Sequence, residues 1–318
     1  MTDLEQLEAT AEVVYRAVLP TPQHCWPLLC ARAGTEVWVK HENHTPIGAF
    51  KVRGGLVYMD HLRRSQPEVT GVLAATRGNH GQSVAFAARA HGLAAVVVVP
   101  HGNSVEKNRA MRAFGAELIE HGEDFNAALD FAAGLAGERD LHMMPSYHDA
   151  LARGVGSYSL ELLRAVSDLD TVYVPIGLGS GICGAIMARD ALGLATKVVG
   201  VVAEQAPTYA LSFQAGKPMP TNASDTMADG LAVRIPDAEA LRIILKGADR
   251  VVAVSEDEIK DAMRAYFTDT HNVAEGAGAA PLAALLKEKE SMAGKKVGVI
   301  LSGGNVDAAV YQPILAGA

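Results

Sequence analysis

The sequence contains little that would indicate a secreted or disulfide-linked protein. Its 318 residues include three cysteines, Cys25, Cys30 and Cys183, which form no CxxC pair and leave one thiol unmatched. Scattered thiols of this kind suit a reducing compartment, where each is typically a small core residue. The first residues are acidic and lack the basic-then-apolar order of a signal peptide. We therefore expect a cytoplasmic protein.

Features of membrane and nucleic-acid-binding proteins are also missing. The longest obvious apolar run, residues 93–99, is far shorter than the ~20 residues that cross a bilayer. The net charge is −8, whereas phosphate backbones require a basic surface. With 49% hydrophobic and 20% charged residues, the composition is that of a globular enzyme. We expect a small-molecule substrate, with no membrane and no nucleic-acid partner.

Along the chain, the hydrophobic pattern alternates between the three-to-four-residue spacing of helices and the short continuous runs of buried strands. Near the start, apolar residues three or four positions apart predict a helix that ends before Pro20, and Thr2 with Glu5 fits a capping box in front of it. Runs of nearly continuous apolar residues predict buried strands of parallel sheets. The predicted strands are 72–75, 94–99, 117–119, 171–176, 197–203, 250–254 and 297–301, and helical patterns lie between them, for example at 83–90, 104–114 and 157–165. This is the pattern of an α/β protein.

A glycine-rich segment, Gly177-Leu178-Gly179-Ser180-Gly181, follows one predicted strand and precedes a helix. Free backbone N–H groups and the positive end of a helix dipole make such a turn a site for an anion, usually a phosphate. A dinucleotide remains an alternative, because Glu204 ends the next strand at about the distance expected of a ribose partner, although GxGxxG is absent. A tight turn without a ligand is the other alternative.

A second notable segment surrounds Lys51. Small residues accompany it in residues 46–55 (PIGAFKVRGG), so that a ligand could approach the backbone closely. A lone lysine is ordinarily a solvated surface residue. Between Phe50 and Val52 at a helix start, however, Lys51 could be desolvated, which would lower its pKa toward the free amine that forms imines.

Together these segments resemble a known family. Residues 46–54 are similar to the PxGSFKxRG signature of fold-type II pyridoxal-phosphate enzymes, the family of threonine and serine dehydratases and serine racemase. Residues 76–82 (TRGNHGQ) resemble that family's SSGNHGQ loop, 177–181 its phosphate loop, and 302–305 its SGGN segment. Residues 227–230 and 275–278 match further segments. The motifs occur in family order over nearly the whole chain, which makes the set far more specific than any one member.

The resemblance implies a role for each matching residue. Lys51 would bind pyridoxal 5′-phosphate as an imine and then act as acid and base at the substrate Cα. Phe50 would pack beside the cofactor ring, Asn79 would bond its hydroxyl, and Ser302 its nitrogen. The implied cofactor-binding set is Phe50, Lys51, Asn79, Gly177, Leu178, Gly179, Ser180, Gly181, Glu275 and Ser302. The implied substrate-binding set is Thr76, Arg77, Gly78, Asn79 and His80.

The implied chemistry is elimination of water from a β-hydroxy α-amino acid, giving a 2-oxo acid and ammonia. A hydroxyl at the ring nitrogen fixes less positive charge there than a carboxylate would, which favours prompt loss of a β leaving group. The family fold implies two α/β lobes, with parallel or mixed sheets covered by helices as in the tryptophan synthase β chain. Residues 1–70 and 149–318 would form the large cofactor lobe and 71–148 a small mobile lobe. A homodimer is expected.

Three departures from the family pattern affect this prediction. Arg77 replaces a serine that serves as the second acid or base in racemases, and a guanidinium is a poor proton shuttle. It could be solvated, bind a substrate carboxylate, or pair with a protein carboxylate. Glu204 matches a family divalent-metal ligand, but Ala210 stands where a second carboxylate is expected, so we predict no metal site. Because the sequence ends soon after Asn305, we also expect no regulatory domain.

Alternatives remain open. A β-replacement synthase of the cysteine or tryptophan type is the nearest, and Phe50 and His80 favour elimination over it. Amino-acid racemisation is disfavoured by Arg77. The non-enzyme alternative is a nucleotide-binding sensor module. Among substrates, the sequence does not distinguish L-threonine or L-serine from threo-3-hydroxyaspartate or phenylserine.

Overall fold

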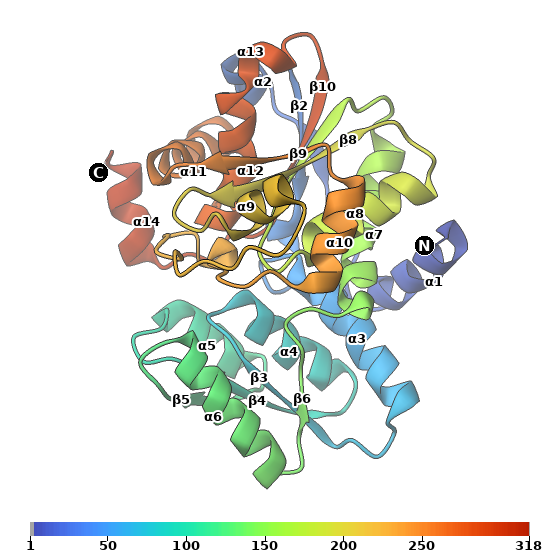
Figure 1. The fold of residues 1–318 in the computed structure, drawn as a ribbon, viewed down its shortest axis with the longest axis vertical. Coiled ribbons are helices and arrows are strands. Elements are labelled where there is room, and N and C mark those ends of the chain that lie inside the picture. Colours follow the sequence, from blue (N-terminus) through green and yellow to red (C-terminus); the bar gives the residue numbers. More distant parts are fainter. Residues whose placement is uncertain (1–2, 318) are drawn as a thin grey trace.

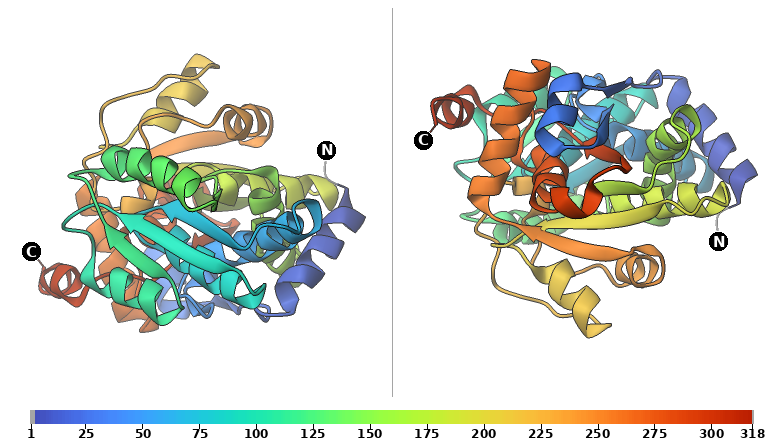
Figure 2. Two further views of the ribbon diagram at one scale, coloured as in Figure 1. Left: turned by 90° about the horizontal axis from the view of Figure 1, so that it is seen from below. Right: turned by 90° about the horizontal axis from the view of Figure 1, so that it is seen from above.

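The computed structural model describes residues 3–317, which form two sheets with helices on both sides of each (Figures 1 and 2). In spatial order, the six-stranded sheet comprises β1(Gln23–Cys25), β2(Glu36–His41), β10(Lys296–Leu301), β7(Thr171–Pro175), β8(Lys197–Ala203) and β9(Arg250–Val254). The four-stranded sheet comprises β5(Glu117–Glu120), β4(Ala94–Val99), β3(Gly71–Ala75) and β6(His142–Met143). All neighbouring strands are parallel except β1, which pairs antiparallel with β2. The α/β class with parallel and mixed sheets is confirmed.

The helices alternate with the strands along the chain. They are α1(Leu4–Tyr15), α2(Pro27–Ala33), α3(Lys51–Ser65), α4(Asn79–Ala90), α5(Val105–Ala113), α6(Phe125–Glu138), α7(Asp149–Ala165), α8(Ser180–Ala191), α9(Thr208–Ala215), α10(Ala238–Gly247), α11(Glu256–Thr270), α12(Gly276–Lys287), α13(Lys289–Met292) and α14(Ala308–Leu315), with 3₁₀ turns η1(Glu42–His44) and η2(Asp229–Leu231). Within residues 3–317, no helix combines the length and apolar character that crossing a membrane requires.

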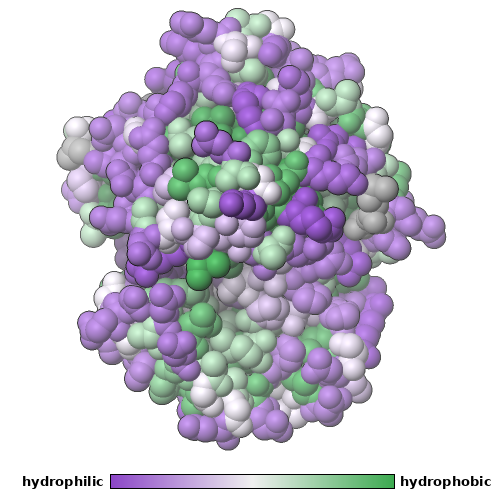
Figure 3. Space-filling model, viewed as in Figure 1, coloured by the Kyte–Doolittle hydropathy of each residue, from purple (hydrophilic) through white to green (hydrophobic). Residues whose placement is uncertain are grey.

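Each sheet separates two layers of apolar side chains. In β8, Val199 and Val201 contribute to one core cluster while Val198 and Val202 contribute to the cluster on the opposite face. This alternation follows from the two-residue period of a strand and explains why a strand covered on both faces is apolar throughout. We call the four-stranded sheet with α4, α5 and α6 the small lobe, and the rest the large lobe. Figure 3 shows the molecule narrowing to a waist where the two lobes meet.

All seven predicted strands are present, with ends that differ by at most one residue. The sequence did not predict β1, β2 or β6. Strand β2 contains Lys40 and His41, whose polar side chains are fully buried and interrupt the apolar run. Helix α1 ends at Tyr15, earlier than predicted, and Asp3 caps it by accepting a hydrogen bond from the backbone N–H of Gln6. Thr2 of the predicted capping box lies outside the described residues.

Candidate active site

The four motif segments lie together because the chain brings them to one edge of each sheet. The residue 76–82 segment follows β3, the 177–181 segment follows β7, and the 302–305 segment follows β10. Since β7 and β10 are parallel neighbours, their carboxyl ends open at the same side of the large sheet. Ligands of open α/β sheets bind at this edge. Lys51 begins α3, which runs from the large lobe toward the small one (Figure 1).

Lys51 is half-buried and weakly paired. Its Nζ lies 3.5 Å from Ser180 Oγ and 5.0 Å from the centroid of the Phe50 ring. Burial lowers the pKa of Lys51 to about 8, against the smaller opposing effect of the Glu275 carboxylate. The direction of this shift is the one that the sequence led us to expect. A lysine that loses its proton near neutral pH is suited to forming an imine and to moving protons.

Ser302 is held next to the Lys51 segment by backbone pairing. The N–H of Phe50 donates to the Ser302 carbonyl at 2.9 Å, and the N–H of Gly304 donates to the Gly48 carbonyl at 3.0 Å. Ala49 and Gly303 form an isolated antiparallel bridge between these two bonds. Gly48 has φ +68°, and a Cβ there would come within 2.6 Å of Asn305 Oδ1. The two segments therefore pack too closely for a larger residue at position 48.

A chain of amide and carboxylate groups crosses from this pair of segments to the small lobe. Asn305 Nδ2 donates to the Ile47 carbonyl and to Asn79 Oδ1, each at 2.8 Å. Asn79 Nδ2 in turn donates to Glu275 Oε1 at 2.5 Å. Burial raises the pKa of Glu275, while the Lys107 ammonium and the Asn79 bond act in the opposite direction. The sequence assigned no role to Asn305, although it ends the SGGN motif.

The glycine segment is built for close approach to the backbone. Helix α8 begins at Ser180, and Gly179 precedes it with φ +104°. A Cβ on Gly177 would lie 2.4 Å from the Gly230 carbonyl, and one on Gly179 would lie 2.7 Å from the Ala240 Cβ. No side chain caps the start of α8, and Lys51 Nζ lies 3.5 Å from the hydroxyl of Ser180, the first residue of this helix. This arrangement can hold a phosphate. Leu178 contributes its carbonyl, which accepts from the Tyr209 hydroxyl at 2.9 Å.

The predicted substrate loop, residues 76–80, lies at the start of α4. The Thr76 hydroxyl accepts from the N–H of Gly78 at 3.0 Å, which orders the turn. His80 Nε2 is buried and has no hydrogen-bond partner among the described residues. Burial, followed by the charge of Lys51, lowers the pKa of His80 to about 3, so its ring is neutral at physiological pH. A neutral buried nitrogen of this kind can bond a polar group of a ligand.

Arg77 extends from this loop toward the large lobe. One of its guanidinium nitrogens, Nη1, lies 3.5 Å from Asp229 Oδ1, and both side chains are partly exposed. Lys107 of α5 lies 3.5 Å from Asp229 Oδ2 and 3.4 Å from Glu275 Oε2. Of the roles left open for Arg77, the structure shows pairing with a protein carboxylate. Sequence reasoning missed Lys107 altogether and assigned no role to Asp229, although both lie against predicted site residues.

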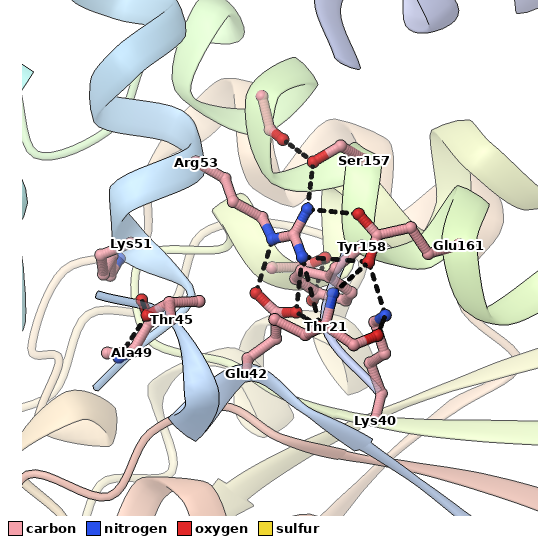
Figure 4. Close-up of polar contacts among 12 residues, drawn as sticks. Thr21, Lys40, Glu42, Thr45, Ala49, Lys51, Arg53, Ser157, Tyr158 and Glu161 are labelled. Carbon is pink, nitrogen blue, oxygen red and sulfur yellow. Dashed lines mark hydrogen bonds and ion pairs between the residues drawn. The ribbon is translucent and has the colours of Figure 1, made fainter. Parts of the chain in front are cut away.

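A buried ion network fixes the start of α3 (Figure 4). Arg53 is fully buried and donates to both carboxylate oxygens of Glu42, at 2.7 and 2.9 Å. It also donates to Glu161 of α7 at 2.6 Å, and Lys40 donates to the other Glu161 oxygen at 2.5 Å. Two cations and two anions therefore balance. Because Arg53 lies two residues after Lys51, the network determines where the catalytic candidate sits.

Glu204, which matches a metal-ligand position of the family, contacts a lysine in this protein. Lys287 Nζ lies 3.2 Å from Glu204 Oε1, 3.1 Å from Glu258 Oε2 and 3.0 Å from the Ala253 carbonyl. An ammonium group thus occupies the space between three oxygens. Across residues 3–317, no cluster of three or more histidine, cysteine or acidic side chains has a metal-binding arrangement.

These features define an α/β enzyme that has a desolvated lysine facing a glycine-rich helix start. The family described as pyridoxal-phosphate dependent enzymes matches residues 14–303. The chain belongs to this family and depends on pyridoxal phosphate for activity. The fold-type II resemblance inferred from the motifs is thereby confirmed.

Individual relatives support the same assignment. The chain is 33% identical to L-threonine ammonia-lyase of Thermotoga maritima, over 99% of this chain and 78% of the relative. It is 34% identical to a biosynthetic L-threonine dehydratase of Pasteurella multocida, over 96% of this chain but 60% of the relative. Maize serine racemase superposes with a TM-score of 0.91 at 28% identity, covering 99% and 97% of the two chains.

The residues at this site fit pyridoxal phosphate. The cofactor requires a primary amine, an anion site and partners for its ring atoms. Lys51 supplies a half-buried amine whose hydrogen bond to Ser180 Oγ is long, at 3.5 Å. The start of α8 supplies uncapped backbone N–H groups. Asn79 and Ser302 lie next to the Lys51 segment through the contacts described above, and His80 supplies the unpaired nitrogen.

Proposed function

We propose that this enzyme eliminates water from a β-hydroxy α-amino acid, and that hydrolysis of the resulting enamine, which takes up one water, gives a 2-oxo acid and ammonia. The observation that carries the proposal is the position of Ser302 beside the segment of the desolvated Lys51: the N–H of Phe50, the residue before Lys51, donates to the Ser302 carbonyl, and the Ser302 hydroxyl is the group implied to face the ring nitrogen. A hydroxyl there limits the positive charge on the ring and favours elimination. The relatives named threonine ammonia-lyase or dehydratase support the same reaction class.

In this mechanism the bound cofactor serves as an electron sink for negative charge at Cα. Lys51, as a free amine, would take the Cα proton. The backbone N–H groups at Gly177, Leu178, Gly179, Ser180 and Gly181 would hold the phosphate. Asn79, kept in orientation by Asn305 and Glu275, would bond the ring hydroxyl. Thr76 and the backbone of Gly78 to His80 receive the substrate carboxylate, while Phe50 limits water access to one side of the ring.

L-Threonine and L-serine are the first substrates we propose, and threo-3-hydroxyaspartate and phenylserine the next. Racemisation, the activity in the name of the maize neighbour, is disfavoured because Arg77 replaces the second acid or base and pairs with Asp229. We further propose that residues 71–148 move relative to residues 1–70 and 149–318. A homodimer in the cytoplasm is part of the same proposal, and light scattering of the purified protein tests its assembly.

The variant Lys51→Ala tests the central role. Wild-type protein should be yellow, and borohydride should bleach that band. In Lys51→Ala the band and the release of 2-oxo acid should both be lost, because the imine needs a primary amine at this position. Lys217→Ala, at an exposed lysine, is the matched control and should keep both. Elimination retained by Lys51→Ala would refute the proposal, as would a wild-type protein that binds no cofactor.

A panel of β-hydroxy amino acids, scored for 2-oxo acid release, identifies the substrate. Chiral analysis of the unreacted L-serine measures racemisation in the same samples. We expect negligible D-serine beside elimination. Rapid appearance of D-serine would instead assign the activity to racemisation.

A further inference from the structure

We propose that Asp229 and Lys107 are positioning residues that, with Arg77 and Glu275, fix the substrate loop between the two lobes. These four residues form the inter-lobe ion cluster. Arg77 and Lys107 belong to the small lobe, whereas Asp229 and Glu275 belong to the large lobe. The inference rests on the proposed dehydratase function, because it assigns these residues a task in binding that enzyme's substrate.

Every ion pair of the cluster crosses between the lobes. The Asp229 carboxylate receives two cations, Arg77 through Oδ1 and Lys107 through Oδ2, each at 3.5 Å. Lys107 also lies 3.4 Å from Glu275. Asp229 is therefore the group on which both small-lobe cations converge. Removing its charge weakens two contacts at once and leaves the Lys107–Glu275 pair.

The cluster acts directly on the loop, since it holds three consecutive residues. Arg77 pairs with Asp229, and Asn79 donates to Glu275 at 2.5 Å. Between them, Gly78 packs on the Lys107 side chain so closely that a Cβ would lie 2.5 Å from Lys107 Cδ. The position of the loop therefore depends on the large lobe as well as on its own helix, α4.

Within the cluster, the Arg77–Asp229 contact is suited to opening and closing. Arg77 and Asp229 are 45% and 39% exposed, so their separation returns both charges to water at modest cost. The Arg53–Glu42 pair differs sharply, because both side chains are 0% exposed and their separation would strand buried charges. Partly exposed charges at 3.5 Å can hold a closed arrangement and still release it for substrate exchange.

A second set of contacts holds the helix that carries Lys107. At the start of α5, the Ser104 hydroxyl and the N–H of Val105 donate to Asp307, the residue that precedes α14. In return, the N–H of Ala308 at the start of α14 donates to Glu106 of α5 at 3.0 Å. Each helix thus supplies a carboxylate to the other's free N–H groups, as capping requires. This exchange places Lys107 within reach of Asp229.

The decisive variant is Asp229→Asn, with Asp225→Asn as the control in the same connection. Asp225 is exposed and should tolerate the change. For Asp229→Asn, we expect KM to rise about tenfold with a much smaller change in kcat, because the two ion pairs that Asp229 makes with Arg77 and Lys107 are lost. The rise should be similar for L-serine, L-threonine and threo-3-hydroxyaspartate. Asp229→Glu should largely restore KM, and the cofactor absorbance should stay unchanged.

Hydrogen–deuterium exchange of the apoprotein gives a readout that needs no turnover. Peptides covering residues 76–90 and 105–113 should exchange faster in Asp229→Asn than in the wild type and Asp225→Asn. Adding Arg77→Gln to Asp229→Asn should raise KM little further, since both changes remove the same contact. Arg77→Gln alone, at a partly exposed side chain, provides the test if Asp229→Asn folds poorly.

Two outcomes would overturn the inference. One is wild-type KM and wild-type exchange in Asp229→Asn. The other is an Arg77→Gln defect confined to threo-3-hydroxyaspartate, which would make Arg77 a receptor for the substrate's second carboxylate. Failure of the dehydratase proposal gives a different result: the wild type releases no 2-oxo acid from any β-hydroxy amino acid. The exchange comparison would then still decide whether the cluster holds the loop.

Discussion

At the scale of single residues, the site depends on opposing effects on the pKa values of two groups, Lys51 and Glu275. Burial lowers the pKa of Lys51, and the Glu275 carboxylate partly offsets that effect. Burial raises the pKa of Glu275, and Lys107 and Asn79 partly offset that in turn. The sequence predicted the desolvation of Lys51 from its neighbours Phe50 and Val52. It could not predict the contribution of Glu275, because that carboxylate lies 224 positions away and reaches the site only through the fold.

The lowered pKa of Lys51 leads to a prediction about cofactor uptake. The apoprotein should bind pyridoxal phosphate faster as pH rises through about 8, because the imine forms from the free amine. An ordinary lysine would show this rise near 10.4. Stopped-flow absorbance between pH 6.5 and 10 measures the midpoint. A midpoint close to 10 would mean that Lys51 is solvated in the apoprotein.

The same shift sets the sign of a stability change. Because the folded pKa of Lys51 lies below its unfolded value, the unfolded chain binds more protons between about 8 and 10.4. The contribution of Lys51 to apoprotein stability therefore increases with pH across this window and is lost below it.

At the scale of secondary-structure elements, the sequence predicted those whose burial is purely apolar. Strands β3 and β7 are buried at every residue and were found from their composition. Strand β2 was missed because Lys40 and His41 end it, and polar residues in a buried strand follow from partners elsewhere in the chain. Lys40 is compensated by Glu161, which lies 121 positions later on α7. No local pattern carries that information.

Arg53 also joins elements that are distant in the sequence, because its side chain connects α3 to η1 and α7. Replacing it with methionine should lower the free energy of unfolding by about 3–5 kcal/mol, because Glu42 and Glu161 would keep buried charge without their main partner. Arg16→Met is the matched control. Its side chain is 67% exposed and its partner Asp60 is 3.9 Å away, so we expect a change of about 0.5 kcal/mol or less.

Urea unfolding of the apoprotein, followed by circular dichroism, measures both variants. Equal destabilisation by Arg53→Met and Arg16→Met would show that the buried network adds nothing to stability. Selective loss in Arg53→Met should also weaken cofactor binding, because the network positions the start of α3 and hence Lys51.

At the scale of the whole molecule, the sequence predicted the two-sheet α/β architecture and most residues of the candidate site. The motifs identified each segment of the candidate site but did not predict how far apart the segments lie in the folded protein. Lys107 and Asp229 became candidates only when the fold placed both beside residues 77–79. Similarly, sequence comparison could indicate Glu204 as a family metal ligand and Ala210 as a gap. It could not show that Lys287, 83 positions later, reaches the same carboxylate.

This arrangement predicts that the protein is insensitive to chelation. The Lys287 ammonium already lies between Glu204 and Glu258, and a hard divalent ion would have to displace it from a site that lacks the second family carboxylate. EDTA should therefore leave both activity and the melting temperature essentially unchanged.

By contrast, Lys287→Met should lower the free energy of unfolding by about 1 kcal/mol, because two partly exposed carboxylates lose their shared cation. Lys289→Met, at an exposed lysine with no ion pair among the described residues, is the control and should have little effect. Calorimetric scans with and without EDTA measure all three proteins. A large drop in melting temperature for the wild type in EDTA would mean that a metal ion, and not Lys287, holds these carboxylates.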